Sequence, residues 1–239
     1  MAVLLAIVGM ALLTMPVYAV VAKSRRDVNE VGDRGGFVLG SFVRNWFYWF
    51  VWPVERSALA LGLSPTVFNV LGVVFGAWAG WCFASGSLYA GGWLVLLGGT
   101  ADVLDGRIAR ARGIASPRGA FLDSTLDRFA EVAMFVGLAV MCRDSAVAVG
   151  VVATALGGSL LVSYARARGE SLGVVAKVGV MQRAERLLLI GFGGIFDPAA
   201  AAWRGWAEGT LLLGLLGLVA VGTVGTALYR TVWIAQRLD

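Results

Sequence analysis

Seven apolar segments, separated by short polar stretches, set the pattern of the chain. Most are close to the ~20 residues that an α-helix needs to cross the hydrocarbon layer of a bilayer. This pattern predicts an all-α, polytopic membrane protein whose helices form one bundle. One leading helix is expected to precede six core transmembrane helices, and the seven segments are residues 2–22, 67–85, 88–104, 119–141, 145–164, 182–197 and 210–229.

The first apolar segment, residues 2–22, is followed by a basic cluster rather than preceded by one. Because a secretory signal peptide carries its positive charge before the apolar run, a retained transmembrane helix is favoured over a signal peptide. We assign residues 1–36 to this helix and a cytosolic linker. Residues 37–239 are assigned to one membrane domain, since no repeat or break in composition divides them.

A stretch rich in aromatic side chains lies between the linker and the first core segment. Residues 46–50 are Trp-Phe-Tyr-Trp-Phe, and Trp52 and Pro53 follow. Aromatic side chains favour the headgroup layer of a membrane. We therefore expect an amphipathic helix on the cytoplasmic membrane surface, broken near Pro53, and the alternative is a further membrane span.

Composition and charge agree with this interpretation. Hydrophobic residues make up 59% of the chain and charged residues 15%, which argues against a soluble domain. If the segment at 67–85 leaves the cytoplasm, nearly all Lys and Arg fall on the cytoplasmic side, and only Arg143 and Arg204 fall outside. We therefore expect a multi-pass protein of the inner (cytoplasmic) cell membrane, with membrane lipids rather than nucleic acid as partners.

Four aspartates gather where two apolar segments meet. Asp102 and Asp105 lie at the end of one segment, and a helix that starts at Ser116 would carry Asp123 and Asp127. Each pair has the spacing of one helix face. Carboxylates that converge without His or Cys indicate a hard divalent cation, Mg²⁺ or Mn²⁺, because they would otherwise repel one another. The alternative is a set of solvated helix ends.

These aspartates and the residues between them resemble the signature of the CDP-alcohol phosphotransferase (CDP-alcohol phosphatidyltransferase) family. The resemblance extends over about residues 45–235. It implies that a phosphatidyl group is transferred from CDP-diacylglycerol, or an ether analogue, to a polar alcohol, with release of CMP and with the active site at the cytoplasmic face. The matched positions are Asp102, Asp105, Gly106, Ala109, Arg110, Gly119, Asp123 and Asp127.

The resemblance also implies a role for each aspartate. Asp102, Asp105 and Asp123 would hold two metal ions, which clamp the pyrophosphate and neutralise charge on the transferred phosphorus. Asp127 would be both a ligand and the general base that deprotonates the acceptor. The absence of histidine from the chain is consistent with a carboxylate base.

A second set of residues is implied to bind the CDP-lipid. Gly106 lets a nucleotide approach the backbone, and Arg110 can bridge phosphate oxygens. Ser116 matches a donor-contacting position, although helix capping explains a serine there equally well. Thr66 and Asn69 stand in exchanged positions relative to the family motif, which leaves their individual contacts open.

Basic residues near the next two helix ends point to a phosphorylated acceptor, because Arg offers bidentate geometry to phosphate. Positive charge at these ends is also a general topology signal. Within the family the chain looks most like prokaryotic phosphatidylinositol-phosphate and archaetidylinositol-phosphate synthases, so inositol phosphate is the expected acceptor. Glycerol 3-phosphate, inositol and serine are the alternatives. The predicted acceptor-binding residues are Arg166, Arg168, Lys177, Arg183 and Arg186.

A membrane transporter is the alternative from a different functional class. Transporters tend to contain repeats and to place charged residues near the middle of the membrane. Here no repeat is visible, and the aspartates lie at one end of their segments. We therefore expect an enzyme, and the family resemblance further implies a homodimer.

Overall fold

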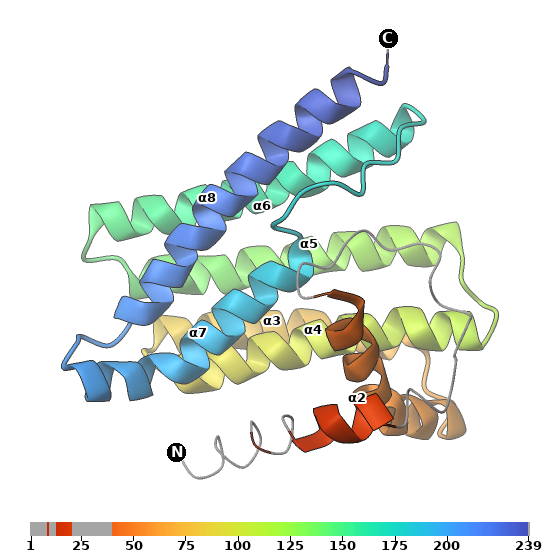
Figure 1. Ribbon diagram of the computed structural model, residues 1–239, viewed down its shortest axis with the longest axis horizontal. Coiled ribbons are helices and arrows are strands. Elements are labelled where there is room, and N and C mark those ends of the chain that lie inside the picture. The colour runs from red at the N-terminus through yellow and green to blue at the C-terminus, as the bar shows by residue number, and fades with distance from the viewer. Residues whose placement is uncertain (1–8, 10–12, 21–39, 239) are drawn as a thin grey trace.

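The computed structural model describes Gly9 and residues 13–20 and 40–238. Within this part of the chain every regular element is a helix (Figure 1), which confirms the all-α class. The predicted leading helix and its linker lie mostly outside the described residues, although 13–20 are helical. The helices with defined bounds are α2 (Gly40–Ala60), α3 (Pro65–Ala84), α4 (Leu88–Ala111), α5 (Pro117–Met141), α6 (Ala146–Ser171), α7 (Arg183–Arg204) and α8 (Thr210–Ala235).

The six helices from α3 to α8 coincide with the six predicted core segments. Among the described residues, three helices are long and apolar enough to cross a membrane, namely α3, α6 and α8. Helices α4, α5 and α7 are not among these three, and each carries at least two acidic residues. The chain is thus a membrane-type helical protein, and the total of six core spans stays a prediction.

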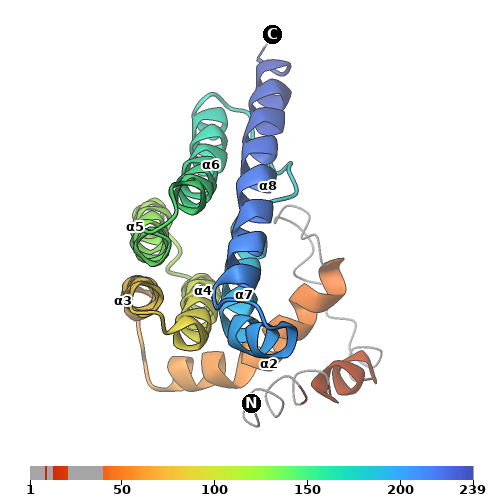
Figure 2. The ribbon, with the colours of Figure 1, turned by 90° about the vertical axis from the view of Figure 1, so that its left-hand side faces the viewer.

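The helices form two connected groups (Figures 1 and 2). In the first group, α3 packs against α4 and α5, and α4 also packs against α7. In the second, α6 packs against α8. Contacts of α5 with α6 and of α7 with α8 join the groups.

Close packing in the first group depends on glycine. A Cβ atom on Gly137 of α5 would lie 1.9 Å from the carbonyl oxygen of Gly80 on α3, so the two backbones touch. At the contact between α4 and α7, a Cβ atom on Gly92 would lie 2.4 Å from the carbonyl oxygen of Gly191 on α7. Small residues allow helices to approach in this way, and any larger side chain at these positions would force them apart.

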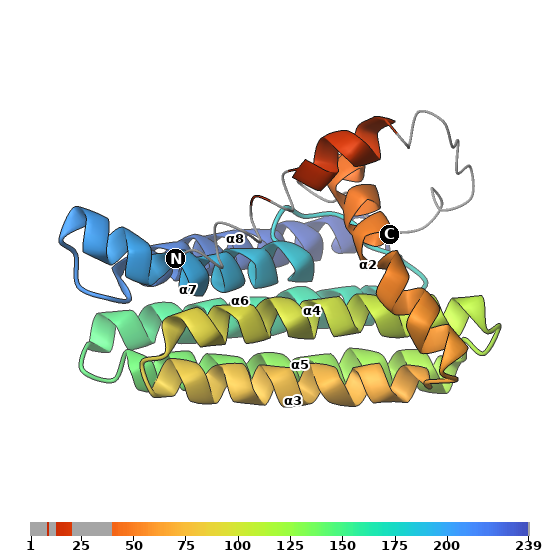
Figure 3. The same ribbon diagram turned by 90° about the horizontal axis from the view of Figure 1, so that it is seen from below.

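Helix α2 lies across the end of the bundle at which α3 begins (Figure 3). Its inner face packs against α3 and α4, and a buried apolar cluster fills the contact. The buried members of the cluster are Val51, Ala58, Phe68, Leu104 and Ile108. The aromatic helix is therefore attached to the bundle, and its predicted position in the headgroup layer stays a prediction.

The predicted break near Pro53 is wrong. Backbone of α2 is helical from Gly40 to Ala60, with Pro53 inside the helix. Proline removes one backbone hydrogen bond from a helix, but Val51 and Ala58, on either side of it, are both buried in the contact with the bundle. This burial offsets the lost hydrogen bond, so the helix continues.

Candidate active site

The four predicted metal ligands lie at one end of the bundle, where α4 ends and α5 begins. Carboxylate oxygens of Asp102, Asp123 and Asp127 lie within 4.8 Å of one another. Asp105 is buried and is linked to this group through Asn69 of α3. The Asn69 amide donates one hydrogen bond to Asp105 and another, at 3.4 Å, to Asp123 Oδ1. The predicted convergence of the two pairs is thus present.

Local sequence explains why the two pairs meet. Gly113 adopts a φ of 66°, a left-handed conformation that favours glycine and turns the chain directly after α4. Ser116 then caps α5, and its side-chain oxygen accepts a hydrogen bond at 3.2 Å from the backbone N–H of Gly119. A short turn with a capped helix start therefore sets the last turns of α4 beside the first turns of α5.

The residues predicted to bind the CDP-lipid lie around this centre. Gly106 is half-buried and Arg110 is exposed, both near the end of α4. Thr66 is exposed on the first turn of α3, and Asn69 lies on the next turn. Asn69 contacts two aspartates, and Ser116 is the cap of α5. Their contacts with a donor stay predictions.

Arg183, the first residue of α7, contacts the aspartates directly. One of its terminal nitrogens lies 2.7 Å from Asp102 Oδ2 and 2.6 Å from Asp127 Oδ2. A single positive charge thus bridges one carboxylate from each pair. This arrangement fits the expected electrostatics, because clustered carboxylates are stable as anions only beside a cation. The oxygen-only donor set fits a divalent Mg²⁺ or Mn²⁺ ion.

Arg186 lies one turn further along α7 and is buried. Its Nε donates a hydrogen bond at 2.9 Å to Oε1 of Glu131, and the two residues are 1% and 4% exposed. Glu131 was not predicted as a site residue. The signal for it is its position four residues after Asp127, on the same face of α5.

The other predicted acceptor residues lie at the end of α6 and in the loop that follows. Arg166 forms an exposed ion pair with Glu170, with 2.8 Å between Arg166 Nε and Glu170 Oε1. Arg168 is exposed on the last turns of α6, and Lys177 is half-buried in the loop. The structure therefore brings Arg183 to the aspartates and places Arg186 one turn later on α7, whereas the remaining three lie on α6 and in the loop before α7.

Helix α8 holds the loop of residues 172–182 in place. The buried Arg230 donates hydrogen bonds to the carbonyl oxygens of Val178, at 2.7 and 3.1 Å, and of Val162, at 2.8 Å. The backbone N–H of Met181 donates to Thr226 Oγ1 at 3.0 Å. These contacts hold the backbone just before the first turn of α7. The sequence alone does not reveal this role of Arg230, because its partners are backbone atoms 52 and 68 residues away.

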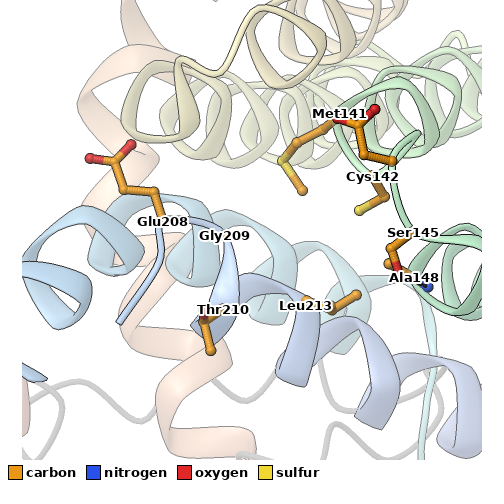
Figure 4. A pocket seen from close by; sticks show the side chains of 9 residues that line it. Met141, Cys142, Ser145, Ala148, Glu208, Gly209, Thr210 and Leu213 are labelled. Carbon is orange, nitrogen blue, oxygen red and sulfur yellow. Dashed lines mark hydrogen bonds between the residues drawn. The ribbon is translucent and has the colours of Figure 1, made fainter. Parts of the chain in front are cut away.

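A separate hollow lies between the α5–α6 junction and the start of α8 (Figure 4). Its volume is about 220 Å³. Figure 4 shows Met141 and Cys142 on one side and Thr210 and Leu213 on the other. Asp144 and Glu208 also line it, and they lie just before the starts of α6 and α8, where negative charge is favourable. No residue predicted for the site lines this hollow.

The fold is that of a membrane-type helical protein, and three aspartates at one end of its bundle lie close enough together to hold a divalent metal ion. Residues 63–233 match the model of the family described as CDP-alcohol phosphatidyltransferase. The chain belongs to this family, as the signature from Asp102 to Asp127 had indicated, and it is therefore an enzyme of the transferase class.

Relatives and solved structures agree. A phosphatidylinositol phosphate synthase of Streptomyces avermitilis is 34% identical over 84% of this chain and 84% of its own length. An archaetidylinositol phosphate synthase of Methanothermobacter thermautotrophicus is 34% identical, over 77% of this chain and 90% of the relative. The crystal structure of the Mycobacterium tuberculosis phosphatidylinositol phosphate synthase with CDP-DAG bound is similar with a TM-score of 0.65 and 30% identity, and the match covers 76% of this chain and 92% of that one. A structure of the same enzyme with manganese and citrate gives a TM-score of 0.66 and 32% identity, and covers 76% and 88%.

Proposed function

We propose that this protein transfers a phosphatidyl group from CDP-diacylglycerol, or an ether analogue, to inositol phosphate and releases CMP. The observation that carries the proposal is the complete aspartate quartet at one end of the bundle. Similarity to phosphatidylinositol phosphate synthases over most of the chain supports the choice of acceptor. Glycerol 3-phosphate, inositol and serine are the alternative acceptors for the same chemistry.

Two divalent ions, Mg²⁺ or Mn²⁺, would be held by Asp102, Asp105, Asp123 and Asp127. When bound, they supply charge neutralisation for the pyrophosphate and for the departing CMP. The proximity of three of these carboxylates and the all-oxygen donor set support this assignment. The manganese-containing structure of the similar M. tuberculosis enzyme supports it as well.

Asp127 would remove the proton of the acceptor hydroxyl. The acceptor oxygen would then bond to the lipid-bearing phosphorus of the donor, and the bond from that phosphorus to the bridging oxygen of CMP would break. Gly106 and Arg110 would hold the CDP group near the end of α4. The absence of histidine from the chain is consistent with a carboxylate in this role.

Arg183 would bind the phosphate of the acceptor beside this base. Its guanidinium already lies 2.6 Å from Asp127 Oδ2, so a phosphate that it holds would bring a neighbouring hydroxyl close to the base. A guanidinium offers bidentate hydrogen bonds to phosphate, which supports a phosphorylated acceptor at Arg183. Arg168 and Lys177 would add positive charge to the acceptor side.

We further propose that the site faces the cytoplasm and that the protein is a homodimer in the cell membrane. The concentration of Lys and Arg at the aspartate end of the sequence segments supports the orientation. A cysteine introduced at position 114, in the α4–α5 loop, should react with an impermeant reagent only from the cytoplasmic side. One introduced at Ser87 should react only from the outside.

The function is tested by supplying purified protein in liposomes with CDP-diacylglycerol, Mg²⁺ or Mn²⁺ and a panel of acceptors, and by following CMP release. We expect inositol phosphate to give a kcat/KM at least about tenfold above inositol and serine, which lack the phosphate and so lose a charged contact. It should also exceed the kcat/KM of glycerol 3-phosphate, which keeps the phosphate but lacks the inositol ring. Preference for another acceptor would overturn the acceptor assignment. Absence of CMP release with every acceptor would overturn the transfer reaction.

A further inference from the structure

An ion pair joins α2 to the helix that carries the first two aspartates. Arg107 of α4 places its Nε 2.6 Å from Glu55 Oε2 of α2, and the side chains are only 13% and 10% exposed. The Arg107 guanidinium also lies over the ring of Tyr48, 4.8 Å from its centroid. Tyr48 and Glu55 are seven residues apart, or two helical turns, so both lie on the face of α2 that meets α4.

The surroundings make this pair a strong constraint. It lies at the contact that the apolar cluster of Val51, Ala58 and Ile108 fills. Little water reaches a pair of this kind, and removal of one partner leaves a charge that is costly to bury. The position of α2 against α4 is therefore set by a directional contact, and not by apolar packing alone.

The ion pair holds the turn of α4 that is proposed to bind the donor. Arg107 is two residues after Asp105 and three before Arg110, so all three lie within two turns. On the α3 side of the same turn, Asn69 donates a hydrogen bond to Asp105. The turn is thus held from α3 by Asn69 and from α2 by Glu55.

We propose that Glu55, supported by Tyr48, is a positioning residue for the CDP-lipid donor, which acts by holding Arg107 and with it the α4 turn from Asp105 to Arg110. This inference rests on the proposed function, because it takes that turn to be the donor site. It gives the aromatic surface helix a part in donor binding in addition to its attachment to the bundle.

The test uses full-length protein and the variants Glu55→Gln, Glu55→Asp and the charge exchange Glu55→Arg with Arg107→Glu. We expect Glu55→Gln to weaken equilibrium binding of CDP-diacylglycerol about five- to tenfold and to raise the Mn²⁺ concentration needed for half-saturation, as loss of one partner of a buried pair would do. The KM for the acceptor should change less than about twofold. Glu55→Asp and the charge exchange should each recover part of the donor affinity.

A matched control is Asp144→Asn, which removes a partner of the exposed pair with Arg143, 3.8 Å apart near the hollow at the start of α6. It should leave donor binding unchanged. The proposal is overturned if Glu55→Gln lowers only the thermal stability, or if it changes donor and acceptor constants equally. Binding of donor and of Mn²⁺ is measured without turnover, so the binding data alone decide this inference. A wild-type protein that binds donor but releases no CMP would contradict the proposed function and leave the inference to those data.

Discussion

The two sides of the aspartate site are built in different ways. The proposed donor side is formed by consecutive helices, and its signature lies within residues 102–127. The proposed acceptor side is assembled from α5, α6, α7, α8 and the loop before α7, through hydrogen bonds between residues 45 to 68 positions apart. A donor site of this kind is specified by local spacing, whereas an acceptor site depends on how the two groups of helices dock.

The largest expected effect is on the donor side and on catalysis. Asp105→Asn and Asp127→Asn should each lower kcat/KM for CMP release by about a thousandfold or more, because each removes a charge on which metal binding or proton removal depends. Asp144→Asn serves as the control and should retain full activity. A variant of the quartet with more than about a tenth of the parent activity would remove that residue from the centre.

The donor side also shows what sequence can predict. Periodicity placed the six core helices, since a run of apolar residues of helical length is a local property. Spacing placed Asp102, Asp105, Asp123 and Asp127 on two facing helix ends, because Ser116 and Gly113 fix the turn between them. These features need no knowledge of distant contacts.

The acceptor side shows where sequence reasoning ends. Arg183 and Arg186 look equivalent in the sequence, yet the first contacts the aspartates and the second forms a buried pair with Glu131. Their difference depends on the packing of α7 between α4 and α8. The break predicted at Pro53 failed for the same reason, because a contact with the distant α4 holds that helix together.

The next largest effect is on stability, and it distinguishes the buried pair of Arg186 from the exposed pair of Arg166. Arg186→Ala should lower the free energy of unfolding by about 3–5 kcal/mol, because it leaves Glu131 buried without its partner. Arg166→Ala breaks an exposed pair and should cost at most about 1 kcal/mol. Thermal unfolding of both variants in the same detergent measures the difference. Equal shifts in Tm would show that the Arg186 pair is not a buried structural contact.

A smaller effect is expected on the KM values, which should distinguish the proposed acceptor side from the proposed donor side. Arg183→Ala should raise the KM for inositol phosphate more than about tenfold and leave the KM for CDP-diacylglycerol nearly unchanged, because a charge-assisted contact to the acceptor is lost. Arg110→Ala should show the opposite bias. Lysine at position 183 should restore only part of the loss, since an ammonium lacks the fork of a guanidinium. If both alanine variants raise the same KM, the division into two sides is wrong.

The smallest effect tests the contact that holds the acceptor loop. Thr226→Val leaves the backbone N–H of Met181 without its acceptor, which typically costs about 1–3 kcal/mol, and should raise the acceptor KM about threefold. Thr231→Val is the matched control, because the Thr231 hydroxyl donates a hydrogen bond within α8, to the carbonyl oxygen of Ala227. It should leave the acceptor KM unchanged. The same KM for both variants would show that the loop is not positioned through Thr226.

The most direct test of the metal centre is a Mn²⁺ titration of the purified chain, followed by electron paramagnetic resonance with CDP-diacylglycerol present. The wild type should bind two ions per chain, Asp102→Asn and Asp123→Asn should lose at least one, and excess EDTA should stop CMP release. Undiminished CMP release in excess EDTA, or the same Mn²⁺ stoichiometry in both variants as in the wild type, would contradict a catalytic centre built from these four aspartates.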